Sequence, residues 1–487
     1  MLRKIIRLAG LGVLVAGAAA LALYLAGLRV VLDGGGMPRL AFTASADAQA
    51  ERIARHREAQ RSAATAAEAE SPDAPAAPSS PAETPPAENA RPETPDPLPP
   101  YWTDFRGPAR DGHYRQQPIR TDWPSSGLTP VWKQPVGGGY ASFVAAEGRA
   151  FTIEQRGDHE VVAAYDVASG RELWTHESRG AFKEMMGGDG PRATPTWHDG
   201  RIYALGATGE LRCLDDTTGR LLWRTNILED ADASNLQWGM SAAPLIVGDT
   251  VVTLPGGTRG RSVIAYDRTT GEQAWSALDD VQSYSSPMLV TLAGVRQILV
   301  FSASRLMGIT PDRGEVLWEF PWTTQYGVNA SQPLLLDDRR VFVSTGYGTG
   351  AAAIELESSG GRLTPRELWR TNRMKNQFTS SVLHDGFIYG LDEAILACID
   401  ARTGEIKWKG GRYGYGQVML ASGHLIVLTE GGDLALVRPT PEAHVEVARF
   451  PTLEGKTWNH PAIVDGYLLV RNLNEMAAFD LRVPSSR

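Results

Sequence analysis

The feature that most constrains the fold is a tryptophan that returns every 39 to 52 residues after position 130. Each of these tryptophans lies in a short apolar run, and no stretch after Pro100 shows convincing helical periodicity. A period of about 40 to 50 residues, built from several short β-branched and aromatic runs with turns between them, is typical of propeller-like arrays of four-stranded units. The repeat therefore predicts a β-propeller, with one tryptophan in most units: Trp132, Trp174, Trp223, Trp275, Trp318, Trp369 and Trp408.

The best copies of the repeat place an aspartate, a Thr-Gly or Ser-Gly turn and the tryptophan at fixed spacing, as in Asp215, Gly219 and Trp223. The aspartate can accept hydrogen bonds from the turn, and glycine tolerates the left-handed conformation. A buried indole contributes about 150 to 250 Å² of packing area, or up to roughly 4 to 6 kcal/mol. We expect these tryptophans to be structural. Cys213 and Cys398 occupy the small apolar slot that is alanine in two other copies, so we expect core residues and no disulfide.

The number of units follows from the sets of first to third strands, of which the sequence contains eight. They begin near Ser142, Ala193, Ala242, Ser286, Ser331, Thr379, Gln417 and His460. The last set ends at Asp480 with no fourth strand after it, whereas the run Pro130 to Val136 has no partner in its own unit. Pairing these two runs would close the ring and remove exposed strand edges. We therefore expect residues 101–487 to form an all-β, eight-bladed propeller closed by an N-terminal strand.

The amino terminus has a different character. Residues Leu8 to Leu28 contain no charge over 21 positions, and as a helix they would span about 31 Å, close to the hydrocarbon thickness of a bilayer. Three cations precede the run and two follow it, which modestly favours a cytoplasmic amino end. We expect residues 1–34 to be a cytoplasmic stub and a transmembrane signal-anchor helix, at the bacterial inner membrane with the propeller in the periplasm. A cleaved signal peptide is the alternative, although the run exceeds the usual length of about 7 to 15 residues.

Residues 35–100 are expected to be a linker. A charged, alanine-rich stretch begins at Ala44, and residues 71–100 contain eleven prolines. Proline at this density favours extended polyproline II, with a reach of about 90 Å for that half. The alanine-rich half is compatible with a short helix or with a disordered chain. The sequence thus predicts a spacer between the membrane and the propeller.

Composition excludes several classes of function. The net charge of −8 provides no basic field for nucleic acid, whose binding depends on phosphate neutralisation by Lys and Arg. No CxxC, HExxH, Walker or GxSxG motif occurs. The run from Gly346 to Gly350 resembles a dinucleotide-binding loop, but it joins two expected strands, so we interpret it as a hairpin turn.

The repeat resembles a known family. The pattern Ala-x-Asp-x-x-Thr-Gly-x-x-x-Trp is similar to the tryptophan-docking motif of the pyrroloquinoline quinone (PQQ) repeat family, and the run YWTDFRGPARDGHY is similar to the lead-in of bacterial PQQ-like propellers. The similarity extends from Tyr101 to about Arg482, with degraded copies at Gly308 to Trp318, Ala353 to Trp369 and Ala435 to Ala448. The family includes eight-bladed quinoprotein alcohol dehydrogenases and BamB-like envelope proteins that are not enzymes.

A candidate binding site is expected where the loops that lead into the first strands meet at one mouth of the propeller. These loops are rich in polar and aromatic side chains, as a small-molecule or peptide site requires. A mouth can also be polar simply because water fills the channel, and the sequence leaves both interpretations open. The candidates are Lys183, Glu184, Asp189, Arg192, Asn235, Gln237, Trp238, Tyr284, Tyr326, Asn329, Gln332, Lys375, Asn376, Gln377, Tyr415, Gln417, Trp458, Asn459 and His460.

The resemblance also raises the question of a cofactor. In the dehydrogenases that the chain resembles, PQQ lies between a tryptophan and a disulfide of adjacent cysteines, beside a calcium ion and an aspartate base. Here the two cysteines are 185 positions apart. Trp238 could stack on a quinone, and Glu184 or Asp189 could ligate calcium or act as a base. Lys375 or Arg192 could neutralise the quinone carboxylates. None of these residues stands in a family motif, so no metal site and no catalytic residue is assigned.

Two functional hypotheses follow. The first is a membrane-anchored, periplasmic binding or scaffold protein, BamB-like, whose partner is an envelope protein or a small ligand. The alternative is a PQQ- and calcium-dependent alcohol or sugar dehydrogenase.

Overall fold

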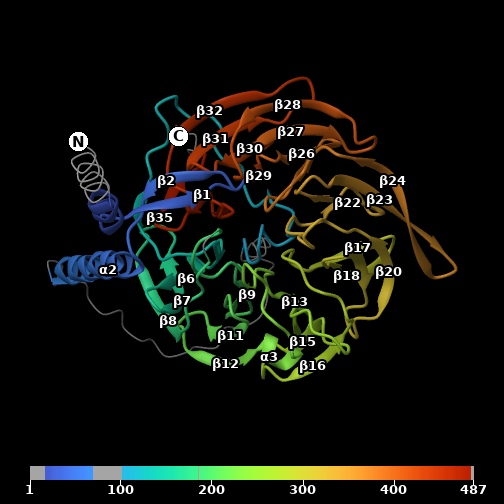
Figure 1. The fold of residues 1–487 in the computed structure, drawn as a ribbon, viewed down its shortest axis with the longest axis horizontal. Helices are drawn as coiled ribbons and strands as arrows, with labels where there is room; N and C mark the ends of the chain where they lie inside the picture. The colour runs from blue at the N-terminus through green and yellow to red at the C-terminus, as the bar shows by residue number, and fades with distance from the viewer. Residues whose placement is uncertain (1–16, 70–100, 185, 484–487) are drawn as a thin grey trace, which may run out of the picture.

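The computed structural model describes residues 17–69, 101–184 and 186–483 of the chain. Eight antiparallel sheets surround one axis, which Figure 1 views end-on. In most blades the strands pair in chain order, each with the next, which confirms the predicted propeller of eight four-stranded units. We number the blades from the sheet that begins at β5.

The strand bounds are as follows. Blade 1 comprises β5 (Val144–Ala146), β6 (Arg149–Arg156), β7 (His159–Asp166) and β8 (Glu172–Arg179), and blade 2 comprises β9 (Thr196–His198), β10 (Arg201–Leu205), β11 (Glu210–Asp215) and β12 (Leu221–Asn226). Blade 3 comprises β13 (Leu245–Val247), β14 (Thr250–Thr253), β15 (Val263–Asp267) and β16 (Gln273–Ala277), and blade 4 comprises β17 (Met288–Leu292), β18 (Val295–Phe301), β19 (Arg305–Ile309) and β20 (Val316–Pro321). Blade 5 comprises β21 (Leu334–Leu335), β22 (Arg340–Thr345), β23 (Gly350–Ser359) and β24 (Arg362–Thr371), and blade 6 comprises β25 (Val382–His384), β26 (Phe387–Asp392), β27 (Ile395–Asp400) and β28 (Ile406–Arg412). Blade 7 comprises β29 (Gln417–Ala421), β30 (His424–Leu428), β31 (Asp433–Arg438) and β32 (Val445–Pro451), and blade 8 comprises β33 (Ala462–Val464), β34 (Tyr467–Arg471), β35 (Glu475–Asp480) and β4 (Trp132–Pro135). A short strand, β3 (His113–Tyr114), adds to blade 7 beside β29.

The ring closes through β4, which precedes blade 1 in sequence but belongs to blade 8. Trp132 lies opposite Ala478 of β35, and the N–H of Val131 donates to the carbonyl of Ala478 at 2.8 Å. The two ends of the propeller sequence therefore share one sheet, and the predicted closure is confirmed. Closure leaves no first or last sheet open to edge-to-edge pairing.

The docking tryptophans join neighbouring blades. Trp223 of blade 2 lies against Gly271 of blade 3, where an added Cβ would be 2.7 Å from the indole, and its Nε1–H donates to the carbonyl of Arg268 at 3.1 Å. The same contact with the glycine of the following blade recurs for Trp132, Trp174, Trp275 and Trp369, while the indole of Trp408 donates to Thr440. These contacts confirm the structural role of the tryptophans.

Trp318 departs from this pattern. Its indole nitrogen donates to the side chain of Gln297 in its own blade at 2.5 Å. The reason lies in blade 5, whose degraded repeat replaces the short Thr-Gly turn with the long hairpin β23–β24, visible at the right of Figure 1. The receptor glycine for Trp318 is therefore missing.

Other expectations about the propeller are confirmed with one correction. Cys213 and Cys398 are buried, unpaired strand residues. Gly346 to Gly350 joins β22 to β23 as a turn. A single helical turn, α3 (Ile227–Ala231), does interrupt the strands, capped by the Asn226 side chain, which accepts from the N–H groups of Leu228 and Glu229. Five residues are too few for a helical period to be detected in the sequence.

The amino-terminal region contains regular structure, and the alanine-rich half of the expected linker adopts the helical alternative. Residues 17–25 are helical, β1 (Leu28–Leu32) and β2 (Pro38–Phe42) form a hairpin, and helix α2 (Ala46–Ala69) follows. Among the described residues, no helix has the length and apolar character needed to cross a membrane. Part of the expected anchor, residues 8–16, lies outside the described residues, as does the proline-rich segment within residues 70–100.

Helix α2 is docked on the propeller. The buried guanidinium of Arg57 donates to Glu172 of blade 1 at 3.1 Å, and to Gln134 at 2.9 Å and the carbonyl of Pro135 at 3.1 Å in blade 8. Ile53, one helical turn earlier, is also buried. The helix therefore lies across the seam between blade 8, which contains the closing strand β4, and blade 1. The β1–β2 hairpin and helix α2 lie between residues 17–25 and the proline-rich segment in the sequence. Because α2 contacts the propeller directly, the length of the proline-rich segment alone does not set the distance between residues 17–25 and the propeller.

The lead-in segment, residues 101–114, lies across the propeller axis. Arg106 donates to the carbonyls of Ser380 and Ser381 in blade 6, at 3.3 and 2.9 Å. Arg110 donates to the carbonyls of Pro244 in blade 3 and Pro287 in blade 4, at 2.5 and 2.9 Å. Burial lowers the pKa of Arg106 to about 10, which still leaves it charged at neutral pH. The segment thus ties blades on different sides of the axis and obstructs the channel between them.

Candidate functional site

A cavity of about 870 Å³ lies at the mouth of the propeller. Its walls are the loops that lead into the first strands together with the turns between second and third strands. Both sets of loops reach the same end because successive strands of an antiparallel blade alternate in direction. Phe105 of the lead-in segment also lines the cavity, so that segment closes it on the axial side. The mouth is therefore a pocket and not an open channel.

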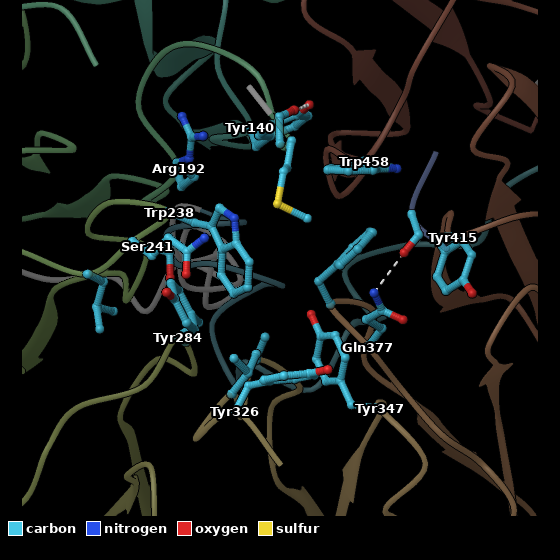
Figure 2. Close-up of a pocket in the computed structure, with 18 of the residues that line it drawn as sticks. Tyr140, Arg192, Trp238, Ser241, Tyr284, Tyr326, Tyr347, Gln377, Tyr415 and Trp458 are labelled. Atoms are coloured by element: carbon cyan, nitrogen blue, oxygen red, sulfur yellow. Dashed lines mark hydrogen bonds between the residues drawn. The ribbon is translucent and has the colours of Figure 1, made fainter. Parts of the chain in front are cut away.

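Aromatic side chains surround the pocket, as Figure 2 shows, and they come from most of the blades. Trp238 and Tyr284 form one pair with ring centroids 5.6 Å apart, and Tyr326 and Tyr347 form a second at 5.7 Å. The aromatic residues are Phe105, Tyr140, Trp238, Tyr284, Tyr326, Tyr347, Phe378, Tyr415 and Trp458. Burial raises the pKa of Tyr284 and of Tyr415 to about 12, so these phenols stay neutral and act as hydrogen-bonding groups.

Two cations contact this aromatic wall: Arg192 lines the pocket, and Lys456 lies against Trp458. Arg192 donates to the carbonyl of Gly188 at 2.5 Å, and its guanidinium lies 4.5 Å from the ring centroid of Phe182. Burial lowers the pKa of Arg192. The ammonium group of Lys456 lies 4.1 Å from the ring centroid of Trp458, and burial lowers its pKa to about 8. Both cations therefore face aromatic rings and carbonyls at the mouth.

His460 lies at the base of the pocket and is fully buried in contact with Arg106. Nδ1 is 2.7 Å from the Pro461 carbonyl, and Nε2 is 3.2 Å from the Arg106 guanidinium. Burial and the arginine lower the pKa of His460 to about 3. The neutral imidazole with its proton on Nδ1 satisfies both contacts, so His460 joins the lead-in segment to the base of the pocket.

The tip of the β1–β2 hairpin enters the pocket from above. Residues 32–36 line it, and the N–H of Gly34 donates to Oε1 of Glu430 at 2.6 Å. The side-chain amide of Gln377 donates to the carbonyl of Gly34 at 2.7 Å, the bond drawn dashed in Figure 2. Lys456 donates to the carbonyl of Leu32 at 3.3 Å. The mouth therefore holds a piece of the chain's own backbone.

The structure brings together part of the set predicted from sequence. The predicted residues that line the pocket are Arg192, Gln237, Trp238, Tyr284, Tyr326, Gln377, Tyr415, Gln417, Trp458 and His460. Those that do not line it are Lys183, Glu184, Asp189, Asn235, Asn329, Gln332, Lys375, Asn376 and Asn459. The first group includes all the predicted aromatic residues, because large side chains on these loops reach across the mouth.

The predicted residues outside the pocket wall stabilise the loops. Asn329 and Asn459 are buried, and their amides donate to backbone carbonyls. Glu184 accepts from the N–H of Met186 at 2.9 Å, whereas Asp189 accepts from the N–H of Glu184 at 3.3 Å. Lys375 pairs with Glu393 at 2.8 Å. Short polar side chains at these positions satisfy backbone groups of irregular loops instead of facing the ligand space.

Several residues of the pocket were missed in the sequence. Tyr140 lies in the loop that leads into the first strand of blade 1. This loop was expected at the mouth, but Tyr140 was not among the predicted residues. Tyr347, which lines the pocket, and Glu430, which contacts Gly34 and Trp458 in its wall, lie in turns between second and third strands, and these turns were not among the loops expected at the mouth. The alternation of strand direction is a signal that could have found them. No sequence signal predicts the hairpin tip, because its contacts join residues about 400 positions apart.

The side chains of the mouth differ from the PQQ and calcium site that the resemblance implies. The two cysteines lie within blades 2 and 6, and both are buried in strands. The carboxylates of Glu184 and Asp189 already accept hydrogen bonds from backbone N–H groups of their own loop. Among the described residues, no group of three or more His, Cys, Asp and Glu side chains is placed to hold a metal ion. The described residues therefore do not reproduce the adjacent cysteines or the carboxylate ligands of that site, and no reaction step is derived through the cofactor.

A closed ring of eight blades, docked by tryptophan and open at one aromatic mouth, defines the class of PQQ-like propellers. Comparison with known families agrees, because the PQQ_2 family model, described as outer membrane protein assembly factor BamB, matches residues 158–410, just over half of the chain. The chain belongs to this family.

Individual relatives come from both branches of the class. Outer membrane protein assembly factor BamB of Bordetella pertussis is 21% identical over 315 residues, which are 61% of this chain and 72% of the relative. Quinoprotein alcohol dehydrogenase PedH of Pseudomonas putida is 24% identical over 206 residues, 40% of this chain and 32% of the relative.

Solved structures show the same division. BamB from Moraxella catarrhalis superposes with a TM-score of 0.54 at 14% identity, over 72% of this chain and 99% of that chain. Quinohemoprotein alcohol dehydrogenase from Comamonas testosteroni superposes with a TM-score of 0.56 at 13% identity, over 80% of this chain and 82% of that chain. At these identities the superpositions establish the fold alone.

Proposed function

We propose that the protein is a non-enzymatic binding protein of the bacterial cell envelope that takes a segment of a partner protein into its aromatic mouth. The observation that carries this proposal is that the mouth already holds a polypeptide turn through main-chain hydrogen bonds. Aromatic walls supply contact area, while Arg192 and Lys456 supply positive charge at the same place. The family description and the BamB relatives support a role in an envelope assembly.

The membrane location belongs to the same proposal. The uncharged run from Leu8 to Leu28 would anchor the chain in the inner membrane by a single pass, with the propeller in the periplasm. Because the hairpin follows this run directly and enters the mouth, the mouth would lie near the membrane. The partner would then be an envelope protein with a segment exposed at that surface.

The test is site-specific photocrosslinking in cells that produce the full chain. A benzophenone amino acid replaces Tyr326, which is 63% exposed at the mouth, or Val447, which is 41% exposed on the outer strand of blade 7. We expect a protein adduct at position 326 that is absent at position 447. The adduct should fall at least fivefold when Trp238→Ala removes another aromatic side chain of the pocket wall. Identical adduct patterns at the two positions would contradict the proposal.

A PQQ- and calcium-dependent dehydrogenase is the second candidate, because Trp238 and Arg192 both line the mouth and some relatives are quinoprotein dehydrogenases. The full chain is incubated with PQQ and Ca²⁺ and then passed through a desalting column. The binding proposal expects no retained quinone absorbance and no alcohol-dependent dye reduction. Retained quinone together with dye reduction would replace the binding proposal by the dehydrogenase.

A further inference from the structure

We infer that the mouth is a receptor for a tight, glycine-rich turn of a polypeptide, and that the chain's own turn, Asp33 to Gly36, occupies it until a partner's turn displaces it. This inference rests on the proposed function and names the chemistry of the ligand. The observations that carry it are the contacts of Gly34 and the shape of the wall formed by Tyr415.

Recognition of the turn is through its backbone. The N–H of Gly34 donates to Glu430 at 2.6 Å, and its carbonyl accepts from Gln377 at 2.7 Å, so both polar groups of one peptide residue are read. The carbonyl of Leu32 accepts from Lys456 at 3.3 Å. The hydrogen bonds made by the Glu430 carboxylate and the Lys456 ammonium group are charge-assisted, and the one made by the Gln377 amide is neutral. All three have ordinary lengths. These hydrogen bonds are made to the backbone and do not themselves depend on the side chains of the turn.

The wall formed by Tyr415 makes glycine necessary. A Cβ atom added to Gly34 would lie 2.4 Å from Cγ of Tyr415, and one added to Gly35 would lie 3.1 Å from its hydroxyl oxygen. Neither glycine has a positive φ, so space and not backbone conformation excludes a side chain. The phenol ring therefore requires glycine at position 34, and it leaves little room for a side chain at position 35.

The aspartate before the glycines shapes the turn. Oδ1 of Asp33 accepts from the N–H of Gly35 at 3.0 Å and from that of Met37 at 2.8 Å, and the N–H of Gly36 donates to the Asp33 carbonyl at 2.9 Å. Aspartate is favoured at such positions because its side chain replaces backbone partners within a turn. The preferred ligand is therefore an Asp-Gly-Gly turn.

The receptor side is held ready by its own contacts. Glu430 also accepts from the indole of Trp458 at 3.0 Å and from the N–H of Tyr415 at 3.2 Å. Lys456 donates in addition to the carbonyl of Gly187 at 2.9 Å. These bonds orient both groups toward the turn without needing the turn, as expected of a preorganised site.

The hairpin is held lightly enough to be displaced. Among the residues that the structure describes, its hydrogen bonds to the propeller are the three at Leu32 and Gly34. The apolar side chains of Val30, Leu40 and Phe42 are more than 60% exposed, so they add little packing to these bonds. A tethered ligand acts at an effective concentration in the millimolar range, so a partner's turn competes if it adds contacts in the rest of the pocket.

The experiment measures binding of a fluorescein-labelled peptide with the sequence of residues 28–42 to the full chain in detergent. In the variant Gly34→Leu the chain's own turn cannot seat against Tyr415, which leaves the receptor free. We expect the peptide to bind this variant at least tenfold more tightly than the unaltered chain, by fluorescence anisotropy. A peptide that itself carries Gly34→Leu should not bind measurably. Gln377→Leu, added to the variant chain, should weaken binding of the first peptide about tenfold.

A matched control uses Gly180→Leu, because Gly180 has open space around its Cβ position and no positive φ. This chain should bind the peptide like the unaltered one. Circular dichroism of both variants verifies the fold, and Gly35→Leu provides a second way to release the turn. Equal peptide binding by the unaltered and released chains, or no binding by either released chain, would overturn the inference. If the peptide binds but no partner adduct forms at position 326, the proposed envelope partner would be contradicted, whereas the recognition of a glycine-rich turn would still be supported.

Discussion

At the scale of single residues, the repeat works through a pair that is split between blades. The tryptophan of one blade packs on the glycine of the next, and that glycine is left-handed, as at Gly271 with a φ of +77°. The aspartate of the turn is fixed locally: Asp215 accepts from Thr217 and Thr218, and these hydrogen bonds lower its pKa. A motif that looks local in sequence therefore builds the contact between sheets.

A substitution at Gly271 tests this contact. In Gly271→Ala the new methyl group meets the Trp223 indole at 2.7 Å, so the variant carries overpacking of about 1 to 3 kcal/mol besides left-handed strain of about 1 to 2 kcal/mol. Gly386→Ala is the matched control, because Gly386 has a φ of +80° with open space around it, and should show the strain alone. Urea unfolding followed by tryptophan fluorescence compares the two. Equal losses of stability would mean that the indole does not require glycine.

At the scale of elements, α2 shows how a charged helix can dock. Its buried contacts are concentrated on one face, where Arg57 reaches blades 1 and 8 at once. The sequence of the helix is dominated by Ala, Arg and Glu, and it has no continuous apolar face of the kind that predicts packing against another element. Among the side chains of the helix that the structure describes, the buried ones are therefore Arg57 and the isolated Ile53, and sequence periodicity does not detect so few contacts.

We expect Arg57→Ala to lower the free energy of unfolding by about 2 to 3 kcal/mol. This is less than the 3 to 5 kcal/mol typical for breaking a buried pair, because Glu172 keeps its second partner, Arg156, at 2.5 Å. Arg55→Ala is the control: Arg55 is exposed and pairs only across one helical turn with Glu51 at 3.5 Å, so its loss should cost less than about 0.5 kcal/mol. Thermal unfolding and trypsin cleavage within α2 measure both variants. Similar behaviour of the two would show that α2 is not held at the seam by Arg57.

At the scale of the whole molecule, stability depends on closure of the ring between β4 and β35. The bond from the N–H of Val131 to the carbonyl of Ala478 lies at the start of this pairing. Val131→Pro removes the donor and leaves the carbonyl without its partner, a loss of about 1 to 3 kcal/mol. Val131→Ala keeps the bond and truncates an exposed side chain, so it should change stability by less than about 0.5 kcal/mol. Calorimetric unfolding distinguishes them, and equal melting temperatures would exclude a role for this bond in closure.

The repeat in the sequence was sufficient to predict the number of blades, the closing strand, the docking tryptophans and the buried cysteines. All of these depend on short-range patterns that recur: an alternation of apolar residues, a turn with glycine, and an indole at fixed spacing. The aromatic half of the candidate site was readable for the same reason, since a propeller brings equivalent loops of every blade to one mouth.

Only the tertiary structure decided that Asp33 to Gly36 enters the mouth, that Arg57 bridges the seam and that Arg106 and Arg110 cross the axis. Each depends on a few contacts between residues far apart in the chain, made by polar atoms whose partners are backbone groups or individual side chains. Such contacts leave no period in the sequence, because nothing in a carboxylate, guanidinium or peptide group specifies which distant partner satisfies it until the blades have placed both.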